Sequence, residues 1–97
     1  MIVSFRNSGT EDIFDGKNSK VARQVCPQQL WKIATRKLEQ LDSAEALDDL
    51  FVPPSNRLDA LKQERLGQHS IRVNDQYRVC FVWTAAGATD VEITDYH

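Results

Sequence analysis

The sequence is poor in the residues that cross-link small domains or interrupt their regular structure. Its 97 residues include two cysteines, three prolines and four glycines. Cys26 and Cys80 have neither the spacing of a metal site nor that of a redox motif, so we interpret both as buried thiols in a reducing cytoplasm. The sequence therefore predicts one domain, residues 1–97, that folds around a modest core and uses no metal or other cofactor.

Long apolar runs are missing as well. No stretch reaches the ~18 apolar residues that a membrane-spanning helix requires. The first six residues lack the apolar core and small-residue cleavage site of a secretory signal. We therefore expect a cytoplasmic protein with no membrane partner.

The chain also lacks a large excess of charge of either sign. Its formal net charge is −2 and its pI is about 5.6, which argues against bulk electrostatic attraction to nucleic acid. The charges are uneven, because residues 56–78 carry five basic and three acidic side chains, whereas residues 41–50 carry four acidic and no basic ones. This distribution is compatible with a local basic cleft and an acidic flank elsewhere.

Alternating apolar and polar residues dominate the last forty positions and predict strands over 68–73, 77–84 and 90–95. The intervening segments 74–76 and 86–88 have the composition of hairpin turns. These strands would form an antiparallel meander.

The length of the first turn decides which arginines face each other. A three-residue turn pairs Val73 with Tyr77 and puts Arg72 opposite Arg78, whereas a two-residue turn at 74–75 puts Arg72 opposite Tyr77. Like charges directly opposite destabilise a sheet. Two facing arginines therefore suggest a compensating anion, and the planar guanidinium suits phosphate.

The first half of the chain predicts mostly helix. Residues 2–5 are a short strand candidate, Ser8 or Thr10 could cap a helical turn that ends at Asp15-Gly16, and 17–25 is a loop leading into a helix. The clearest helix spans 27–42, with Pro27 in its first turn and one stripe formed by Leu30, Ile33, Ala34, Lys37, Leu38 and Leu41. Ser43 would cap a short turn over 44–47, and Pro53-Pro54 ends regular structure. The predicted class is α+β, an antiparallel sheet with N-terminal helices packed on one face.

Four segments resemble the HigB family, namely 1–5, 56–61, 67–78 and the ending Val-Glu-Ile-Thr-Asp-Tyr-His at 91–97. HigB proteins, and their close relative GraT, are toxins of type II toxin–antitoxin pairs in the RelE/ParE superfamily. The resemblance implies a RelE-like fold and an mRNA endonuclease that works in the ribosomal A site and inhibits translation. It also implies a HigA-type helix-turn-helix antitoxin as partner, through which alone the toxin would reach operator DNA.

RNA cleavage without a metal needs a base for the 2′-hydroxyl, an acid for the leaving oxygen and cations for the phosphorane. Histidine suits the first two roles, and the chain has only His69 and His97. His97 matches the family ending, which implies a general acid or base, with Tyr96 as a hydroxyl donor or base-stacking surface. His69 falls on the apolar face of its strand, which favours a half-buried structural histidine.

The cations of the predicted site come from residues 57–78. Arg78 matches the catalytic arginine of the family and would stabilise the transition state. Lys62 aligns with a lysine that some members hold near the scissile phosphate, although this chain has Lys-Gln where Lys-Gly is frequent. Phosphate contacts that position RNA are predicted for Arg57, Arg65 and Arg72.

Two other functions remain open at this point. A ParE-type gyrase inhibitor would use the same fold without nuclease chemistry, and the acidic pI is compatible with a non-catalytic binding domain. The combination of His97, Arg78 and Tyr96 favours the nuclease.

Overall fold

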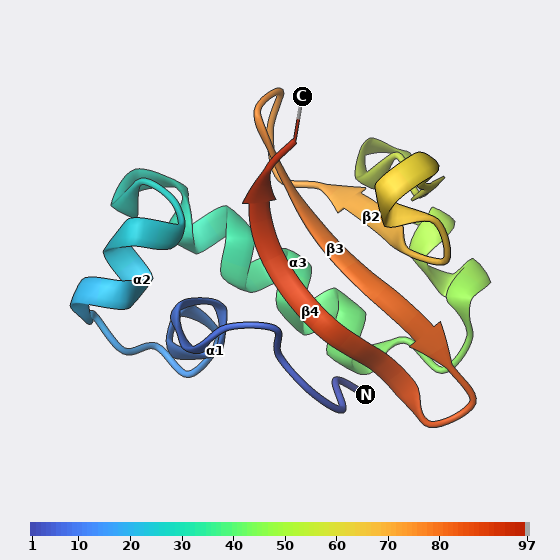
Figure 1. The fold of residues 1–97 in the computed structure, drawn as a ribbon, viewed down its shortest axis with the longest axis horizontal. Coiled ribbons are helices and arrows are strands. Elements are labelled where there is room, and N and C mark those ends of the chain that lie inside the picture. Colours follow the sequence, from blue (N-terminus) through green and yellow to red (C-terminus); the bar gives the residue numbers. More distant parts are fainter. Residues whose placement is uncertain (97) are drawn as a thin grey trace.

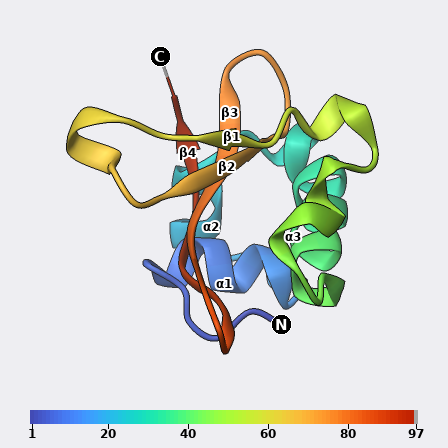
Figure 2. The same cartoon turned by 90° about the vertical axis from the view of Figure 1, so that its right-hand side faces the viewer.

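A four-stranded antiparallel sheet forms the centre of the computed structural model, which describes residues 1–96 (Figure 1). The strands follow each other in chain order: β1 (Asp59–Ala60), β2 (His69–Arg72), β3 (Tyr77–Thr84) and β4 (Gly87–Asp95). The helices are α1 (Ser8–Phe14), α2 (Lys20–Val25) and α3 (Trp31–Ser43), with short 3₁₀ helices at Gln28–Leu30, Leu47–Phe51, Pro54–Asn56 and Gln63–Arg65. Figure 2 shows α3 on one side of the sheet and the loop between β1 and β2 on the other. The predicted α+β class and the meander are confirmed.

The β2–β3 hairpin has the register that a three-residue turn predicts. Arg72 lies opposite Arg78, and the apolar neighbours on the other face pair with each other. The Asn74 side chain fixes the turn, because its Oδ1 accepts hydrogen bonds from the backbone N–H groups of Gln76 (2.9 Å) and Tyr77 (2.7 Å). The alternative two-residue turn is therefore excluded.

Strand β4 begins three residues earlier than predicted. It pairs with β3 from Gly87 onwards, across a turn of only Ala85 and Ala86. The register then shifts between Cys80 and Val82, and Asp90 has a positive φ of 51°. A bulge of this kind inserts an extra residue and interrupts the alternation of faces. This interruption is why the sequence pattern showed only the part of β4 that follows the bulge.

The N-terminal segment runs alongside β4 and does not form the regular strand predicted at 2–5 (Figure 1). Ile2 and Phe5 make isolated parallel bridges to Ala88 and Val91. The Val3 N–H donates to the carbonyl of Ala88 over 2.7 Å, and the β4 bulge bends the chain so that pairing is discontinuous. The segment thus fastens the N-terminus to the sheet.

Helices α1 and α2 pack backbone to backbone. Asn7, rather than Ser8 or Thr10, caps α1, because its side chain accepts from the N–H of Thr10, while Asp15 and Gly16 end the helix as predicted. A Cβ on Gly9 would lie 2.6 Å from the carbonyl oxygen of Val21 on α2. Glycine at this position permits the close approach.

Helix α3 supplies the helical side of the core. It begins at Trp31, after the 3₁₀ turn that follows Pro27, so the predicted start at 27 was too early for α-helix. Its buried residues include most of the predicted stripe, but Ile33 remains 37% exposed. Ser43 is the last residue of α3 and not the cap of a following turn; the next 3₁₀ helix instead begins after Ala46, where the Asp49 carboxylate accepts the backbone N–H. No helix within residues 1–96 is long and apolar enough to cross a membrane.

Candidate functional site

The face of the sheet opposite α3 is polar and carries two rows of side chains. One row crosses β2, β3 and β4 as Arg72, Arg78 and Thr94, and the neighbouring row as Ser70, Cys80 and Glu92. The intervening residues point the other way, where Ile71, Val79 and Ile93 are buried in the core. Strand alternation thus places the predicted strand arginines on one surface, as the sequence indicated.

Arg78 is held by two hydrogen bonds within the protein. Its Nε donates to the buried Ser70 hydroxyl over 2.7 Å, and its Nη2 donates to the carbonyl of Arg57 over 2.7 Å. Arg57 has a left-handed backbone (φ 46°), which turns this carbonyl at the end of a 3₁₀ helix. Within residues 1–96, Nη1 makes no hydrogen bond. The guanidinium is therefore oriented while one N–H edge remains available.

Arg72 is compensated from inside the hairpin. Its Nη2 forms a short ion pair with the Asp75 carboxylate in the turn that follows β2. Arg72 and Arg78 thus direct their guanidinium groups to different acceptors, which relieves the repulsion between facing like charges. For Arg72, the compensating anion that the sequence suggests is the carboxylate of Asp75 in this chain.

A hollow of about 290 Å³ brings together three predicted site residues, Lys62, Arg65 and Tyr96. Its other lining residues are Gln63, Glu64 and Asp95. The cations come from the loop between β1 and β2, residues 61–68, and the tyrosine directly follows the last residue of β4. Tyr96 is 36% exposed and its N–H donates to the carbonyl of Gln76 (3.0 Å). Arg78 on β3 pairs with Thr94 on β4, and Thr94 precedes Tyr96 by two residues.

Arg65 is engaged more fully than its sequence context predicts. Its Nη1 donates to Glu92 Oε1 (2.8 Å) and to Gln68 Oε1 (3.0 Å). The Glu92 side chain is only 12% exposed and that of Arg65 29%. The bond to Glu92 raises the pKa of Arg65 above its usual value, so the guanidinium stays charged. Burial raises the pKa of the neighbouring Cys80 thiol, which keeps it protonated and a poor nucleophile.

Of the two histidines, the structure tests the prediction for His69 only. His69 is partly buried on the apolar face, and its ring stacks on Phe81 with centroids 6.3 Å apart. This placement confirms the half-buried position predicted for it, and its Nδ1 has no hydrogen-bond partner in the described part of the chain. His97 was predicted as the general acid or base, and it lies outside the described residues.

Sequence reasoning missed a buried polar cluster between α3 and the 3₁₀ helix Pro54–Asn56. The Lys37 ammonium on α3 donates to Asn56 Oδ1 over 2.6 Å, and Asn56 is fully buried. The Asn56 amide donates in turn to the Leu50 carbonyl (3.2 Å) and the Gln40 side chain (3.2 Å). Burial lowers the pKa of Lys37, with the charges of Arg36 and Arg72 adding to the effect. A lysine inside an otherwise apolar stripe was the one signal of this cluster.

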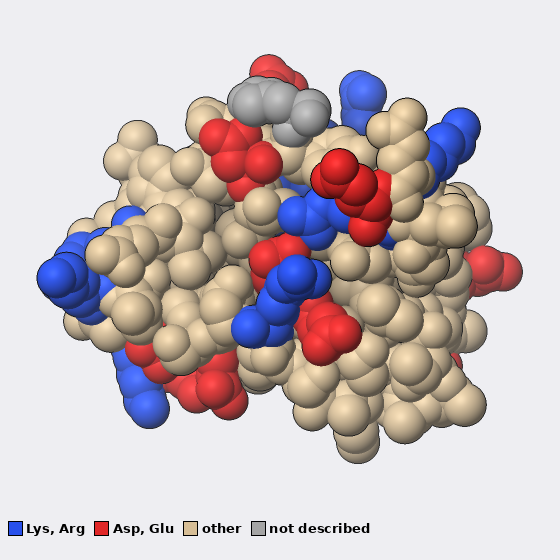
Figure 3. Space-filling model, in the orientation of Figure 1, with Lys and Arg blue, Asp and Glu red and all other residues tan. Residues whose placement is uncertain are grey.

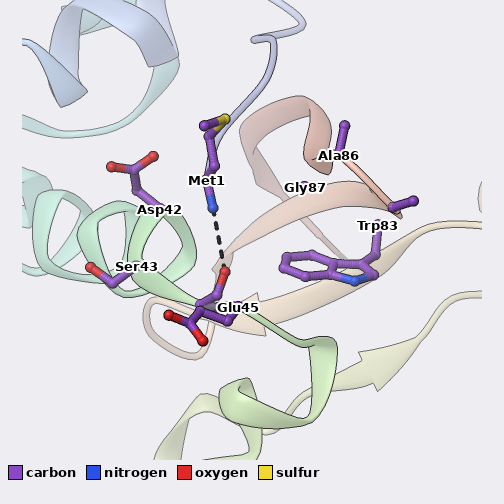
Figure 4. Close-up of a pocket in the computed structure, with 9 residues that line it drawn as sticks. Met1, Asp42, Ser43, Glu45, Trp83, Ala86 and Gly87 are labelled. Atoms are coloured by element: carbon purple, nitrogen blue, oxygen red, sulfur yellow. Dashed lines mark hydrogen bonds between the residues drawn. The ribbon is translucent and has the colours of Figure 1, made fainter.

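Two larger hollows contain none of the predicted site residues. One of about 410 Å³ lies at the opposite end of β3, near Trp83 and the β3–β4 turn. Figure 4 shows the Met1 amino group there, donating to the Ala44 carbonyl (3.3 Å), with Asp42 to one side and Trp83 to the other. The second, of about 460 Å³, lies between Gly16 and α3. The chemistry of the 290 Å³ hollow, and not its size, makes it the candidate site.

The surface over the candidate site mixes both signs of charge. Figure 3 shows acidic and basic side chains interspersed above β3 and β4, in keeping with the ion pairs of Glu92 to Arg65 (2.8 Å) and Arg6 (3.9 Å). This face is therefore not a continuous basic surface. Affinity for RNA through bulk charge would be weak here.

Comparison with known proteins places this chain in one class, the small toxins of type II toxin–antitoxin systems. Residues 3–97 match the family described as "RelE-like toxin of type II toxin-antitoxin system HigB", and the chain belongs to this HigB-like family. It is 36% identical over 83 residues to Toxin HigB-1 of Vibrio cholerae serotype O1, an alignment that covers 86% of this chain and 84% of that protein. An uncharacterized Haemophilus influenzae protein is 40% identical over 55 residues, 57% of this chain and 54% of its own.

The fold has a solved counterpart. The structure of the YoeB–YefM complex from Staphylococcus aureus contains a chain that aligns with a TM-score of 0.60 at 16% identity, covering 100% of this chain and 95% of that chain. At this identity the likeness concerns the fold alone. Together with the family match, it confirms the predicted RelE-like architecture and the toxin class, and toxins of this class pair with an antitoxin.

Proposed function

We propose that this toxin is a ribosome-dependent mRNA endonuclease that cleaves by attack of a 2′-hydroxyl on the adjacent phosphodiester and so inhibits translation. The observation that carries the proposal is the arrangement of Arg78, which two internal hydrogen bonds orient beside the strand that leads to Tyr96. Guanidinium N–H groups fixed before the reaction stabilise developing phosphorane charge without reorganisation.

The remaining roles follow from the chemistry of each side chain. Lys62 would neutralise a non-bridging phosphate oxygen from its place in the hollow, and Tyr96 would stack on a base or donate its hydroxyl. His97 would transfer the proton, as acid or base, since imidazole titrates near neutral pH. Arg57 and Arg72 would hold flanking phosphates, where contacts position RNA without reading its sequence.

The mixed surface charge supports dependence on the ribosome. A protein of net charge −2, with acids among the cations of its candidate site, gains little from counterion release on free RNA. The ribosomal A site would supply the missing affinity by presenting mRNA in a fixed conformation. Such positioning is worth several orders of magnitude in rate.

Mapping of RNA ends tests this function directly. Purified toxin added to ribosomes translating a defined mRNA should create new ends inside the coding region, with 2′,3′-cyclic phosphates from 2′-hydroxyl attack. The same mRNA without ribosomes should remain intact, and toxin lacking His97 should give few or no ends. Growth arrest with intact mRNA, blocked replication and a DNA-damage response would instead support a gyrase inhibitor.

For the partner, we propose a HigA-type antitoxin with a helix-turn-helix domain that brings the toxin to operator DNA. The toxin alone should leave operator DNA unshifted in a gel at physiological salt, because its charge gives it little electrostatic affinity. The purified toxin–antitoxin pair should shift the same DNA. A shift by toxin alone that persists with unrelated competitor DNA would contradict this division of labour.

A further inference from the structure

The β1–β2 loop is attached to the sheet at two places. At its base, the Leu61 N–H donates to the carbonyl of Gln68 over 2.9 Å, which closes the loop into a hairpin. Near its tip, Arg65 reaches Glu92 on β4. Because β1 and β4 are the outer strands of the sheet, this second contact crosses about 14 Å of it, at roughly 4.8 Å per strand.

The second attachment is a partly buried contact, and its acidic partner is the more enclosed of the two. Glu92 stands in the row with Cys80 and Ser70, both of which are fully buried, and its side chain is 12% exposed. Arg65 lies over this row, close enough to influence the Cys80 thiol, and Gln68 accepts from the same guanidinium nitrogen. Without Arg65, the Glu92 carboxylate would lose its closest cation in a place that water reaches poorly.

We infer that Arg65 and Glu92 form a clasp that holds the β1–β2 loop over the polar face of the sheet, so that Lys62 faces Tyr96 across the hollow. Both are positioning residues, and Arg65 serves the site through Glu92 rather than by gripping phosphate. Within residues 61–68 the other backbone hydrogen bonds are local, from the N–H groups of Arg65, Leu66 and Gln68 to carbonyls three residues earlier, so they shape the loop without joining it to β3 or β4. Leu66 at its tip is 79% exposed and adds no buried contact. This inference rests on the proposed nuclease function for its effect on catalysis, but the clasp itself is independent of that function.

Charge-reversal variants distinguish the two possible roles of Arg65, holding the loop through Glu92 or binding phosphate. Arg65→Glu and Glu92→Arg should each lower ribosome-dependent cleavage on the order of tenfold to a hundredfold, mainly in kcat, because Lys62 is displaced. The double variant Arg65→Glu/Glu92→Arg restores opposite charges and should recover most of the activity. A carboxylate at position 65 cannot bind phosphate, so a phosphate-gripping Arg65 predicts no recovery and a raised KM.

Amide hydrogen exchange of the whole protein reads the clasp without any RNA. Amides of 62–67 should exchange faster in both single variants and regain protection in the double variant. Glu92→Gln, which keeps the size and an acceptor, should show a smaller effect of the same sign and covers the case in which Glu92→Arg does not fold. Arg6→Ala is the matched control, since it removes the weaker cation near Glu92 (3.9 Å) without touching the loop.

The outcomes are distinguishable. Unchanged loop exchange in Arg65→Glu and Glu92→Gln would refute the clasp whether or not the wild type cuts RNA. Restored protection without restored activity in the double variant would refute the positioning role and return Arg65 to the phosphate-binding residues. A wild-type protein that cuts no RNA would overturn the nuclease proposal and the role assigned to Arg65 in it, while the exchange data would still decide the contact.

Discussion

Arg78→Ala should lower the cleavage of mRNA on translating ribosomes by about a hundredfold or more, the loss typical of removing one transition-state charge stabiliser. The effect should fall on kcat, because Arg78 is oriented by Ser70 and by the Arg57 carbonyl before any RNA arrives. Single-turnover cleavage with end-labelled mRNA measures it. Full activity of this variant would remove Arg78 from the mechanism.

Two controls show whether the loss of activity comes from misfolding or from the loss of one positive charge: the thermal midpoint of the variant, and a second arginine variant away from the site. Removing Arg78 takes away the donor to the buried Ser70 hydroxyl, a loss of about 1–2 kcal/mol that should lower the thermal midpoint by roughly 4–16 °C. Cleavage is therefore compared at a temperature below the midpoints of both proteins. Arg23→Ala is the matched control, because Arg23 is an exposed arginine on α2 that donates to the side chain of Asn18, far along the chain from the candidate site. It should cleave like the wild type.

Asn56→Ala should destabilise the domain by about 3 kcal/mol or more, since it leaves the buried Lys37 ammonium without its acceptor. The same change removes the donor to the Leu50 carbonyl. For a domain of this size the loss corresponds to a fall in melting temperature of roughly 12–24 °C. Thermal unfolding followed by circular dichroism measures it.

The reason for the loss can be tested by removing both partners. The double variant Lys37→Met/Asn56→Leu replaces the polar pair with apolar side chains of similar size. It should recover a substantial part of the stability lost in Asn56→Ala, because no charge is left buried. A melting temperature of Asn56→Ala within about 3 °C of wild type, equivalent to less than 1 kcal/mol, would show that the cluster contributes little.

Local pattern was enough for the features that depend on alternation and turn length. The face shared by Arg72 and Arg78 follows from counting residues across a turn, and the helix of the Leu38 stripe follows from its period. The same reasoning lost β4 before the bulge at Asp90, since one extra residue reverses the alternation. It also missed β1, whose two residues are too few to show a period.

Contacts between distant segments could not be predicted from pattern. Alternation places Glu92 on the polar face, but it does not say that the loop 61–68 folds back so that Arg65 reaches it. Likewise, Lys37 within an apolar stripe indicates a buried partner, but the pattern does not say which residue it is. Only the fold shows that the segment after α3 turns back and brings Asn56 to Lys37. Both contacts join residues 19 or more positions apart, where sequence spacing carries no geometric information.

The parallel bridges of residues 2–5 also affect how molecules meet. An unpaired outer strand offers its amides and carbonyls as a template on which another molecule can add a strand. Here the N-terminus already occupies part of that template on β4, and β1 presents only two residues on the opposite side. Few backbone groups on the outer strands therefore remain for another molecule to pair with. This arrangement disfavours aggregation through strand addition at high concentration.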